Sequence, residues 1–231
     1  GASGGTALTV KGDITNNSAN AQTINLDLAL LGSSTGIVNT ASGNLTIGGV
    51  VSGAGGITKQ GNSTLILSAN NTYSGGTTIS GGTLQIGAGG TSGTLNANST
   101  ITNNGTLAFN RSNTVTQGTD FAGVVSGSGN LTQAGSGNLL LTGNNTYTGT
   151  TTISAGTLEV GAAGRLGGGA YAGNIANSGL LIYSGSNAQT LSGAISGTGA
   201  LTQNNSSSTL TLSGNNTYTG TTTISAGTLA I

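Results

Sequence analysis

The chain has 231 residues, among them 45 glycines, no proline, cysteine or histidine, and only four basic and four acidic side chains. So little charge leaves no basic stripe to follow phosphates or anionic lipid, which argues against a nucleic-acid partner. Without cysteine there is no disulfide framework or thiolate metal site, and the longest apolar run, residues 26–31, is too short for a membrane-spanning helix, so we expect no direct membrane insertion.

Taken in chain order, the predicted elements fall into three long cassettes joined by segments that match them only in composition. The cassettes cover residues 49–87, 123–161 and 193–231, and the second reads “GVVSGSGNLTQAGSGNLLLTGNNTYTGTTTISAGTLEVG”. The tyrosines that mark them, Tyr73, Tyr147 and Tyr218, lie 74 and 71 residues apart. We interpret residues 1–231 as a single domain built on this internal repeat.

Within each cassette apolar residues alternate with polar ones, as in Leu65 and Leu67 or Leu139 and Leu141. A period of two places such a pair on one face of a strand. No segment keeps an apolar period of 3.6, so we expect no helix. Isoleucine, valine, threonine and tyrosine favour strands, while glycine and asparagine supply the corners between them.

A shorter period lies inside the long one, because a leucine after a small residue and Thr or Asn returns every 19–32 residues. The ladder consists of Leu45, Leu65, Leu84, Leu107, Leu139, Leu158, Leu181, Leu210 and Leu229. Short strands that return at this spacing through glycine corners predict an all-β solenoid. Counting back through Leu26 and Leu8 gives about 10 coils, a rod of roughly 45–50 Å at about 4.8 Å per coil. The usual sense of parallel crossovers makes it a right-handed parallel β-helix.

The order “GSGNLTQAGSGNLLLTGNNTYTGTTTISAGTLEVG” (127–161), with its two counterparts, resembles the passenger-associated strand repeat of bacterial autotransporters. The resemblance covers the three cassettes, more than half of the chain. It implies a right-handed β-helix carried to the outside of a Gram-negative outer membrane, and hence an extracellular or cell-surface location. It also accounts for the missing cysteine, because such passengers cross the periplasm and the pore unfolded.

Two features depart from that family. The sequence has no C-terminal translocator barrel, and it ends at Ile231 in mid-repeat without a capping element. It also opens on “GASGGTALTV”, which lacks the pattern of a signal peptide, so the sequence indicates either a cytoplasmic protein or a processed piece of something longer. We therefore expect either an excised piece of a long passenger or a subunit whose open ends stack on one another.

The ionisable side chains are too few and too scattered for catalysis. Only Lys11 with Asp13, and Arg111 with Asp120, lie close in sequence, and we expect solvated surface ion pairs there. Serines and threonines have no histidine base, glycine runs such as residues 164–170 lack the Lys-Ser/Thr of a phosphate loop, and calcium-loop spacing is absent. The sequence predicts no catalytic, cofactor-binding or metal-binding residue and no enzyme. The remaining ionisable residues are Asp27, Lys59, Glu159 and Arg165.

Two polar surfaces are candidate binding sites. If Ile153 points inward, Thr150 and Thr152 point outward, as do Thr221 and Thr223, but ice binding requires such a row on successive coils and the motif returns only every third coil. The three cassette tyrosines could form an aromatic line for a partner or glycan. The favoured interpretation is that each tyrosine covers the corner of its own cassette.

The sequence thus predicts a structural and adhesive surface module of an autotransporter-type passenger, serving as a rigid stalk or binding surface. Its partner would be a host or neighbouring-cell protein or glycan. The alternative is a self-assembling extracellular fibre subunit that stacks head-to-tail through open ends. An enzyme acting on a polysaccharide comes third, because it would need clustered carboxylates.

Overall fold

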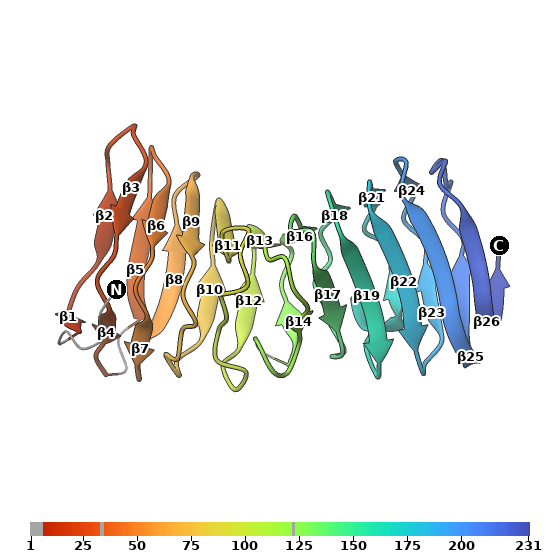
Figure 1. Ribbon diagram of the computed structural model, residues 1–231, viewed down its shortest axis with the longest axis horizontal. Helices are drawn as coiled ribbons and strands as arrows, with labels where there is room; N and C mark the ends of the chain where they lie inside the picture. Colours follow the sequence, from red (N-terminus) through yellow and green to blue (C-terminus); the bar gives the residue numbers. More distant parts are fainter. Residues whose placement is uncertain (1–6, 33–34, 122) are drawn as a thin grey trace.

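The chain winds into a rod with its first described strand, β1 (Leu8–Val10), at one end and its last, β26 (Thr222–Ala230), at the other (Figure 1). The computed structural model describes residues 7–32, 35–121 and 123–231. Every strand pairing in these residues is parallel, and neighbouring strands come from successive coils. The protein is an all-β parallel solenoid of about 10 turns, as the sequence predicts. The right-handed sense stays a prediction.

The strands form four hydrogen-bonded sheets. The smallest sheet contains β1 (Leu8–Val10), β4 (Leu28–Leu30) and β7 (Val51–Gly53). The six-stranded sheet contains β2 (Ile14–Asn16), β5 (Thr35–Thr40), β8 (Gly56–Gln60), β10 (Thr77–Ile79), β12 (Ile101–Asn103) and β15 (Val125–Ser126). The nine-stranded sheet contains β3 (Gln22–Ile24), β6 (Leu45–Ile47), β9 (Thr64–Leu67), β11 (Thr83–Ile86), β13 (Thr106–Phe109), β16 (Asn130–Gln133), β18 (Thr151–Ile153), β21 (Ile175–Asn177) and β24 (Ile195–Ser196). The fourth contains β14 (Val115–Thr116), β17 (Asn138–Leu141), β19 (Thr157–Ala162), β20 (Ala170–Tyr171), β22 (Leu180–Gly185), β23 (Gln189–Leu191) and β25 (Ala200–Leu212), with β26 (Thr222–Ala230) paired to β25.

These sheets make three faces, which the chain visits in turn. The first face consists of β1, β4 and β7. It continues with β14, β17, β19, β22 and the start of β25, because each of these strands directly follows a strand of the nine-stranded sheet along the chain. The second face is the six-stranded sheet, continued by β20, β23 and the end of β25. The third face is the nine-stranded sheet. One coil therefore consists of one pass over the three faces.

Apolar side chains fill the interior of the rod in columns. Leu65, Leu84 and Leu107 are partners on three successive coils of the third face, and all three are fully buried. Each buried leucine contributes on the order of 1.5–3 kcal/mol. The predicted column of stacked leucines is confirmed over this part of the rod, with Leu45 ahead of it in register.

Further along, the predicted ladder is wrong in its register. Leu107 is paired with Leu131 and not with Leu139, which instead lies in a first-face column between Val115 and the leucines Leu158 and Leu181. In the same way Leu181 is followed by Leu201 and not by Leu210. The spacings of 32 residues (Leu107 to Leu139) and 29 residues (Leu181 to Leu210) thus correspond to one coil plus one face. The sequence pattern does not reveal this, because leucines on neighbouring faces have the same local sequence around them.

This register makes the cassette advance by one face at each repeat. The strand after the cassette's first glycine is β7 on the first face, β15 on the second and β24 on the third. Three register steps along the third face connect Leu65 to Leu131. Leu139 occupies the same position in the second cassette as Leu65 does in the first, and it lies on the next face after Leu131. The 71–74-residue repeat therefore corresponds to about three and one-third coils.

Two smaller expectations are that Leu26 belongs to the leucine ladder and that the chain contains no helix. Leu26 is not part of the ladder: Leu28 pairs with Leu8, and Leu26 is 62% exposed at a corner. The only helix in the described segments is a single 3-10 turn, Gly167–Gly169. Accordingly, no helix found there has the length and apolar character needed to cross a membrane.

Glycine is required where the cassettes leave their first strand. Gly53, Gly127 and Gly197 occupy equivalent corners with φ of 100°, 106° and 103°, which disfavours any side chain. A Cβ on Gly127 would lie 2.2 Å from the carbonyl oxygen of Asn103 on the preceding coil. The corners predicted from glycine are confirmed at these positions.

The ladder predicts a fixed distance between outward residues of the third face. Thr46 and Ser196 are joined by seven register steps, about 34 Å at the inter-strand spacing of about 4.8 Å. Because the chain has no cysteine, spin labels on Thr46→Cys/Ser196→Cys report this distance alone. Double electron–electron resonance should give one narrow distribution near it, after allowance for the label linkers. A broad or bimodal distribution would contradict a rigid rod.

Candidate functional site

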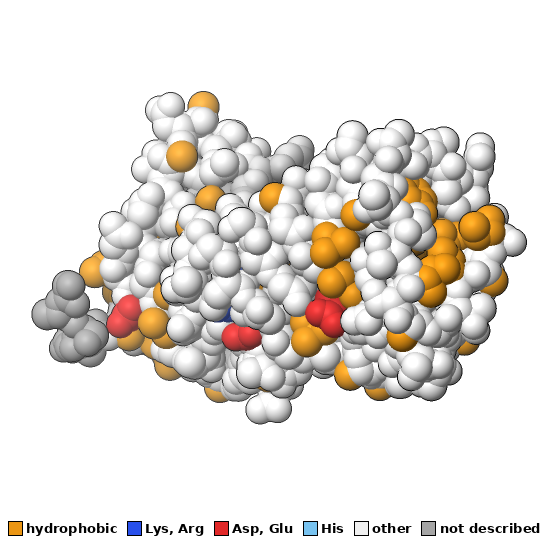
Figure 2. Space-filling view, turned by 45° about the vertical axis from the view of Figure 1, so that its right-hand side comes forward, with side chains coloured by type: hydrophobic (Ala, Val, Ile, Leu, Met, Phe, Trp, Pro, Cys, Tyr) orange, Lys and Arg blue, Asp and Glu red, His pale blue; other side chains and the backbone are white. Residues whose placement is uncertain are grey.

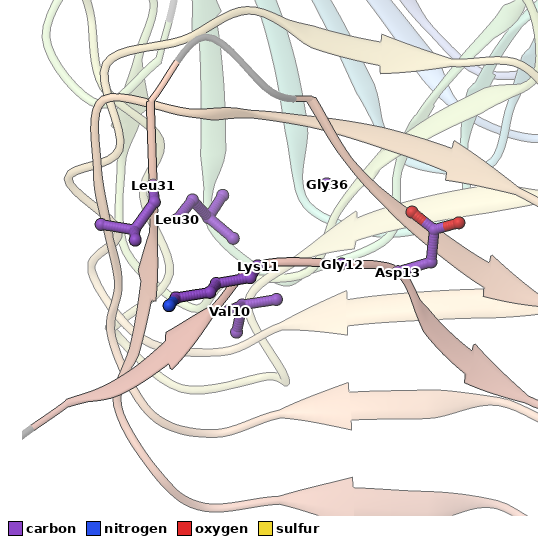
Figure 3. A pocket seen from close by; sticks show the side chains of 7 residues that line it. All are labelled: Val10, Lys11, Gly12, Asp13, Leu30, Leu31 and Gly36. Carbon is purple, nitrogen blue, oxygen red and sulfur yellow. The ribbon is translucent and has the colours of Figure 1, made fainter.

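The ionisable residues do not gather into a site. The described residues hold no group of three or more Asp, Glu, His or Cys side chains placed for a metal ion. Lys11 and Asp13 border a hollow of about 60 Å³ at the N-terminal end, floored by Val10 and Leu30. Their side chains point in different directions (Figure 3), and no ion pair joins them, contrary to expectation.

Arg111 is also different from what the sequence predicts. Its guanidinium lies 3.6 Å from Asp120, but Arg111 is only 5% exposed, so the pair is not a solvated surface pair. The remaining donors reach the carbonyl oxygens of Thr91 (2.7 Å) and Gly93 (2.9 Å). Arg111 therefore fixes the segment after the first cassette, because arginine supplies several donors from one rigid fork.

Lys59 lies inside the rod and has no acidic partner there. Its Nζ donates to the carbonyl oxygens of Gln60 (2.8 Å), Gly61 (2.9 Å) and Gly81 (3.0 Å). The side chain is fully buried, and this burial lowers the pKa of Lys59 from 10.5 to about 8. The ammonium group satisfies corner carbonyls of two neighbouring coils that would otherwise be left without donors.

Glutamine takes the place of Lys59 in the other two cassettes. Gln133 is buried, and its Nε2 donates to the carbonyl oxygens of Gly135 and Gly137, both at 2.9 Å. Gln203 is equally buried and bonds the same kind of corner. The shared requirement is an inward donor at the corner, and a charge is not needed for it.

The second asparagine of the “NNTY” motif performs a related task at another corner. The Oδ1 atoms of Asn71, Asn145 and Asn216 accept the backbone N–H of the residue one coil earlier, at 2.8–2.9 Å. Their Nδ2 atoms donate to carbonyl oxygens within their own corner. These side chains replace ladder hydrogen bonds where the chain turns from one face to the next.

Two of the three cassette tyrosines point inward and not toward a partner. Tyr73 and Tyr147 are fully buried, and each hydroxyl pairs with a threonine four residues on, Thr77 at 2.7 Å and Thr151 at 2.8 Å. Burial raises the pKa of both phenols. The hypothesis of an aromatic line is wrong, because the three cassettes place their tyrosines on three different faces. Each tyrosine covers the corner of its own cassette.

The outward threonines are placed as predicted within one cassette but do not line up between cassettes. Ile153 is buried while Thr150 is exposed and Thr152 half-buried. The equivalent strands β10, β18 and β26 lie on the second, third and first faces, so their threonines form no common row. A different row, missed by sequence reasoning, runs along the second face: Thr58, Thr78, Thr102 and Ser126 are register partners.

A polar hollow was also missed, at the corner where the second face turns into the third. This corner trough is shallow and wide open to solvent, has a volume of about 410 Å³ and is bordered by residues of successive coils. Its polar side chains are Asn62, Thr83, Asn104, Thr106, Ser128 and Asn130. No single stretch of sequence contains them, so only the register between coils could have indicated the site.

The surface itself is nearly uncharged. Figure 2 shows mostly polar, uncharged atoms, with a few acidic side chains and a gathering of hydrophobic atoms toward the C-terminal half. Glu159 in that half is engaged, accepting hydrogen bonds from Ser184 (2.6 Å) and Asn138 (3.0 Å). The fold and these corners define a solenoid repeat protein whose buried polar groups hold the coils together.

The comparison with protein families identifies the repeat. Residues 57–86, 131–160 and 205–231 match the passenger-associated-transport-repeat. The chain therefore contains three passenger-associated transport repeats, which are typical of autotransporter passenger domains. Such repeats imply a secreted or surface-exposed bacterial protein, and modules of this kind are generally non-catalytic. No curated protein and no solved structure matches the chain.

The buried tyrosine hydroxyl predicts a measurable loss on its removal. Tyr147→Phe leaves Thr151 without that partner and should lower the free energy of unfolding by about 1 kcal/mol. Tyr218 makes the same contact with Thr222, but in an exposed setting, so Tyr218→Phe is the matched control and should change stability little. Urea unfolding followed by circular dichroism measures both. An equal loss of unfolding free energy in the two variants would contradict the idea that burial strengthens the tyrosine–threonine hydrogen bond.

Lys59 predicts a specific dependence of stability on pH. Between about pH 8 and 10.5 the unfolded chain holds a proton on Lys59 that the folded chain has lost, so the folded state gains stability as the pH rises. Lys59→Gln keeps donors at the corner and removes this titration. The difference in free energy of unfolding between the two proteins should therefore shift in favour of wild type from pH 7 to pH 10. A difference that does not vary with pH would contradict a lowered pKa.

Proposed function

We propose that this protein is a structural and adhesive surface module of an autotransporter-type passenger, displayed outside a Gram-negative cell. The observation that carries the proposal is the parallel pairing of successive coils, in four sheets that together run from β1 to β26, built on three passenger-associated repeats. A solenoid in which each coil contacts only its neighbours grows in length without changing its cross-section. That property suits a stalk or spacer.

The distribution of polar groups supports a non-enzymatic role. Lys59, Arg111 and the cassette asparagines are used to satisfy backbone groups at corners. Lys11 and Asp13 point apart at one end of the rod. General acid–base catalysis requires an ionisable side chain positioned at the reacting atom, and Lys59 and Arg111 are instead engaged with backbone carbonyl groups.

The surface supports a binding role more than a purely mechanical one. The repeat turns by one face per cassette, so equivalent outward residues face three directions along a single rod. A partner on a host or neighbouring cell would meet similar surfaces whichever side of the rod it approached. Several weak contacts along one rod can combine into firm attachment.

Attachment to cells tests the adhesive part of the proposal. Beads coated with the folded chain should bind cultured epithelial cells or bacterial cells several-fold more than beads coated with Leu84→Asp, which places an unpaired charge at a fully buried position and abolishes the fold. Equal binding by both preparations would overturn adhesion. Chain-coated beads that clump with one another instead would favour head-to-tail self-assembly.

A further inference from the structure

We propose that the corner trough between the second and third faces binds a neutral, extended polysaccharide lying parallel to the rod axis. This inference rests on the proposed adhesive function and names the class of its ligand. The trough lies where β10, β12 and β15 turn into β11, β13 and β16. Because the trough is shallow and its side chains are polar, a ligand would lie along it and be held by hydrogen bonds.

The trough contains donors that are already oriented. The Oδ1 of Asn104 accepts from the backbone N–H (3.1 Å) and the hydroxyl (3.3 Å) of Ser128 on the next coil. The Oδ1 of Asn130 likewise accepts from the N–H (2.9 Å) and the hydroxyl (3.0 Å) of Thr150. Each amide oxygen is therefore held, and the attached NH₂ group is fixed without an acceptor among the described residues. Donors fixed in advance lose little entropy on binding.

The lining selects against charged ligands. Among the described residues no charged side chain borders the trough, so a phosphate, carboxylate or ammonium group would find no counter-charge there. Amide and hydroxyl groups can instead exchange hydrogen bonds with sugar hydroxyls, which both donate and accept. A neutral, hydroxyl-rich molecule is the ligand class that this lining can satisfy.

The spacing of the lining selects an extended molecule. Thr83, Thr106 and Asn130 are register partners on three successive coils, so their side chains repeat along the rod axis. From Asn62 to Asn130 the trough spans about three coil spacings, roughly 14 Å. A linear chain of sugars presents hydroxyl groups at comparable intervals, whereas a compact small molecule would contact only one or two coils.

An internal comparison indicates that this polarity is not imposed by the repeat. One cassette further on, the equivalent register partners are Thr157, Leu180 and Ala200. Leucine and alanine therefore fit where Thr106 and Asn130 stand, and the corner folds in the same way. The polar lining belongs to this trough and not to the solenoid in general.

The decisive variant is Asn130→Asp, which keeps the acceptor for Thr150 and removes the NH₂ donor. The matched control is Asn174→Asp, because Asn174 accepts from the N–H of Ala194 (2.9 Å) in the same structural role outside the trough. The probes are short, linear, neutral glucans with β-1,3, β-1,4 and α-1,4 linkages. Binding is measured on the intact 231-residue chain by nitrogen-15 NMR, which observes side-chain amides directly.

At least one glucan should cause saturable shifts of the Asn104 and Asn130 side-chain signals. Asn130→Asp should weaken that binding about tenfold, the effect of losing one hydrogen bond, while Asn174→Asp leaves it unchanged. No saturable shift with any glucan, or equal weakening by both variants, overturns the inference. Cell attachment that persists in Asn130→Asp while glucans fail to bind overturns this inference alone and leaves the adhesive module standing.

Discussion

The structure depends on one constraint: each coil must lie in register with the next so that its backbone groups are paired. Parallel pairing of β9, β11 and β13 places Leu65, Leu84 and Leu107 directly above one another. The same register that satisfies the backbone therefore builds the apolar interior. A shift of one residue would turn the leucines outward and the threonines inward, so backbone pairing and side-chain burial select the same winding.

The corners are the places where this pairing fails, and the buried polar residues are found there. Carbonyl and N–H groups that leave a strand have no ladder partner, and burying them unpaired is costly. Lys59, Gln133 and Gln203 supply donors, while Asn71 and Asn145 supply both a donor and an acceptor. The sequence “GNNTYTGTTTISAGTL”, which stands unchanged at 143–158 and 214–229, is thus accounted for without a catalytic role, since its polar atoms complete the backbone network.

The rotation of the cassette by one face has consequences for function. A repeat equal to a whole number of coils would collect equivalent residues on one side of the rod. Here Tyr73 and Tyr147 lie under different faces, and so do the outward threonines beside them. Any surface that recurs along the rod must instead be composed of residues from different cassette positions, as in the corner trough formed by Asn62, Asn104 and Asn130.

The sequence by itself determined the fold class, the absence of long helices and the inward leucines, because alternation and glycine corners are local properties of the chain. It could not determine that Leu107 pairs with Leu131 or that Leu139 lies on another face, since coil length is set by how each corner packs on the one before. The sequence also could not show that Arg111 lies inside the rod, or that the residues of the corner trough lie side by side. Those features depend on register between residues about 20 positions apart, which only the tertiary structure fixes.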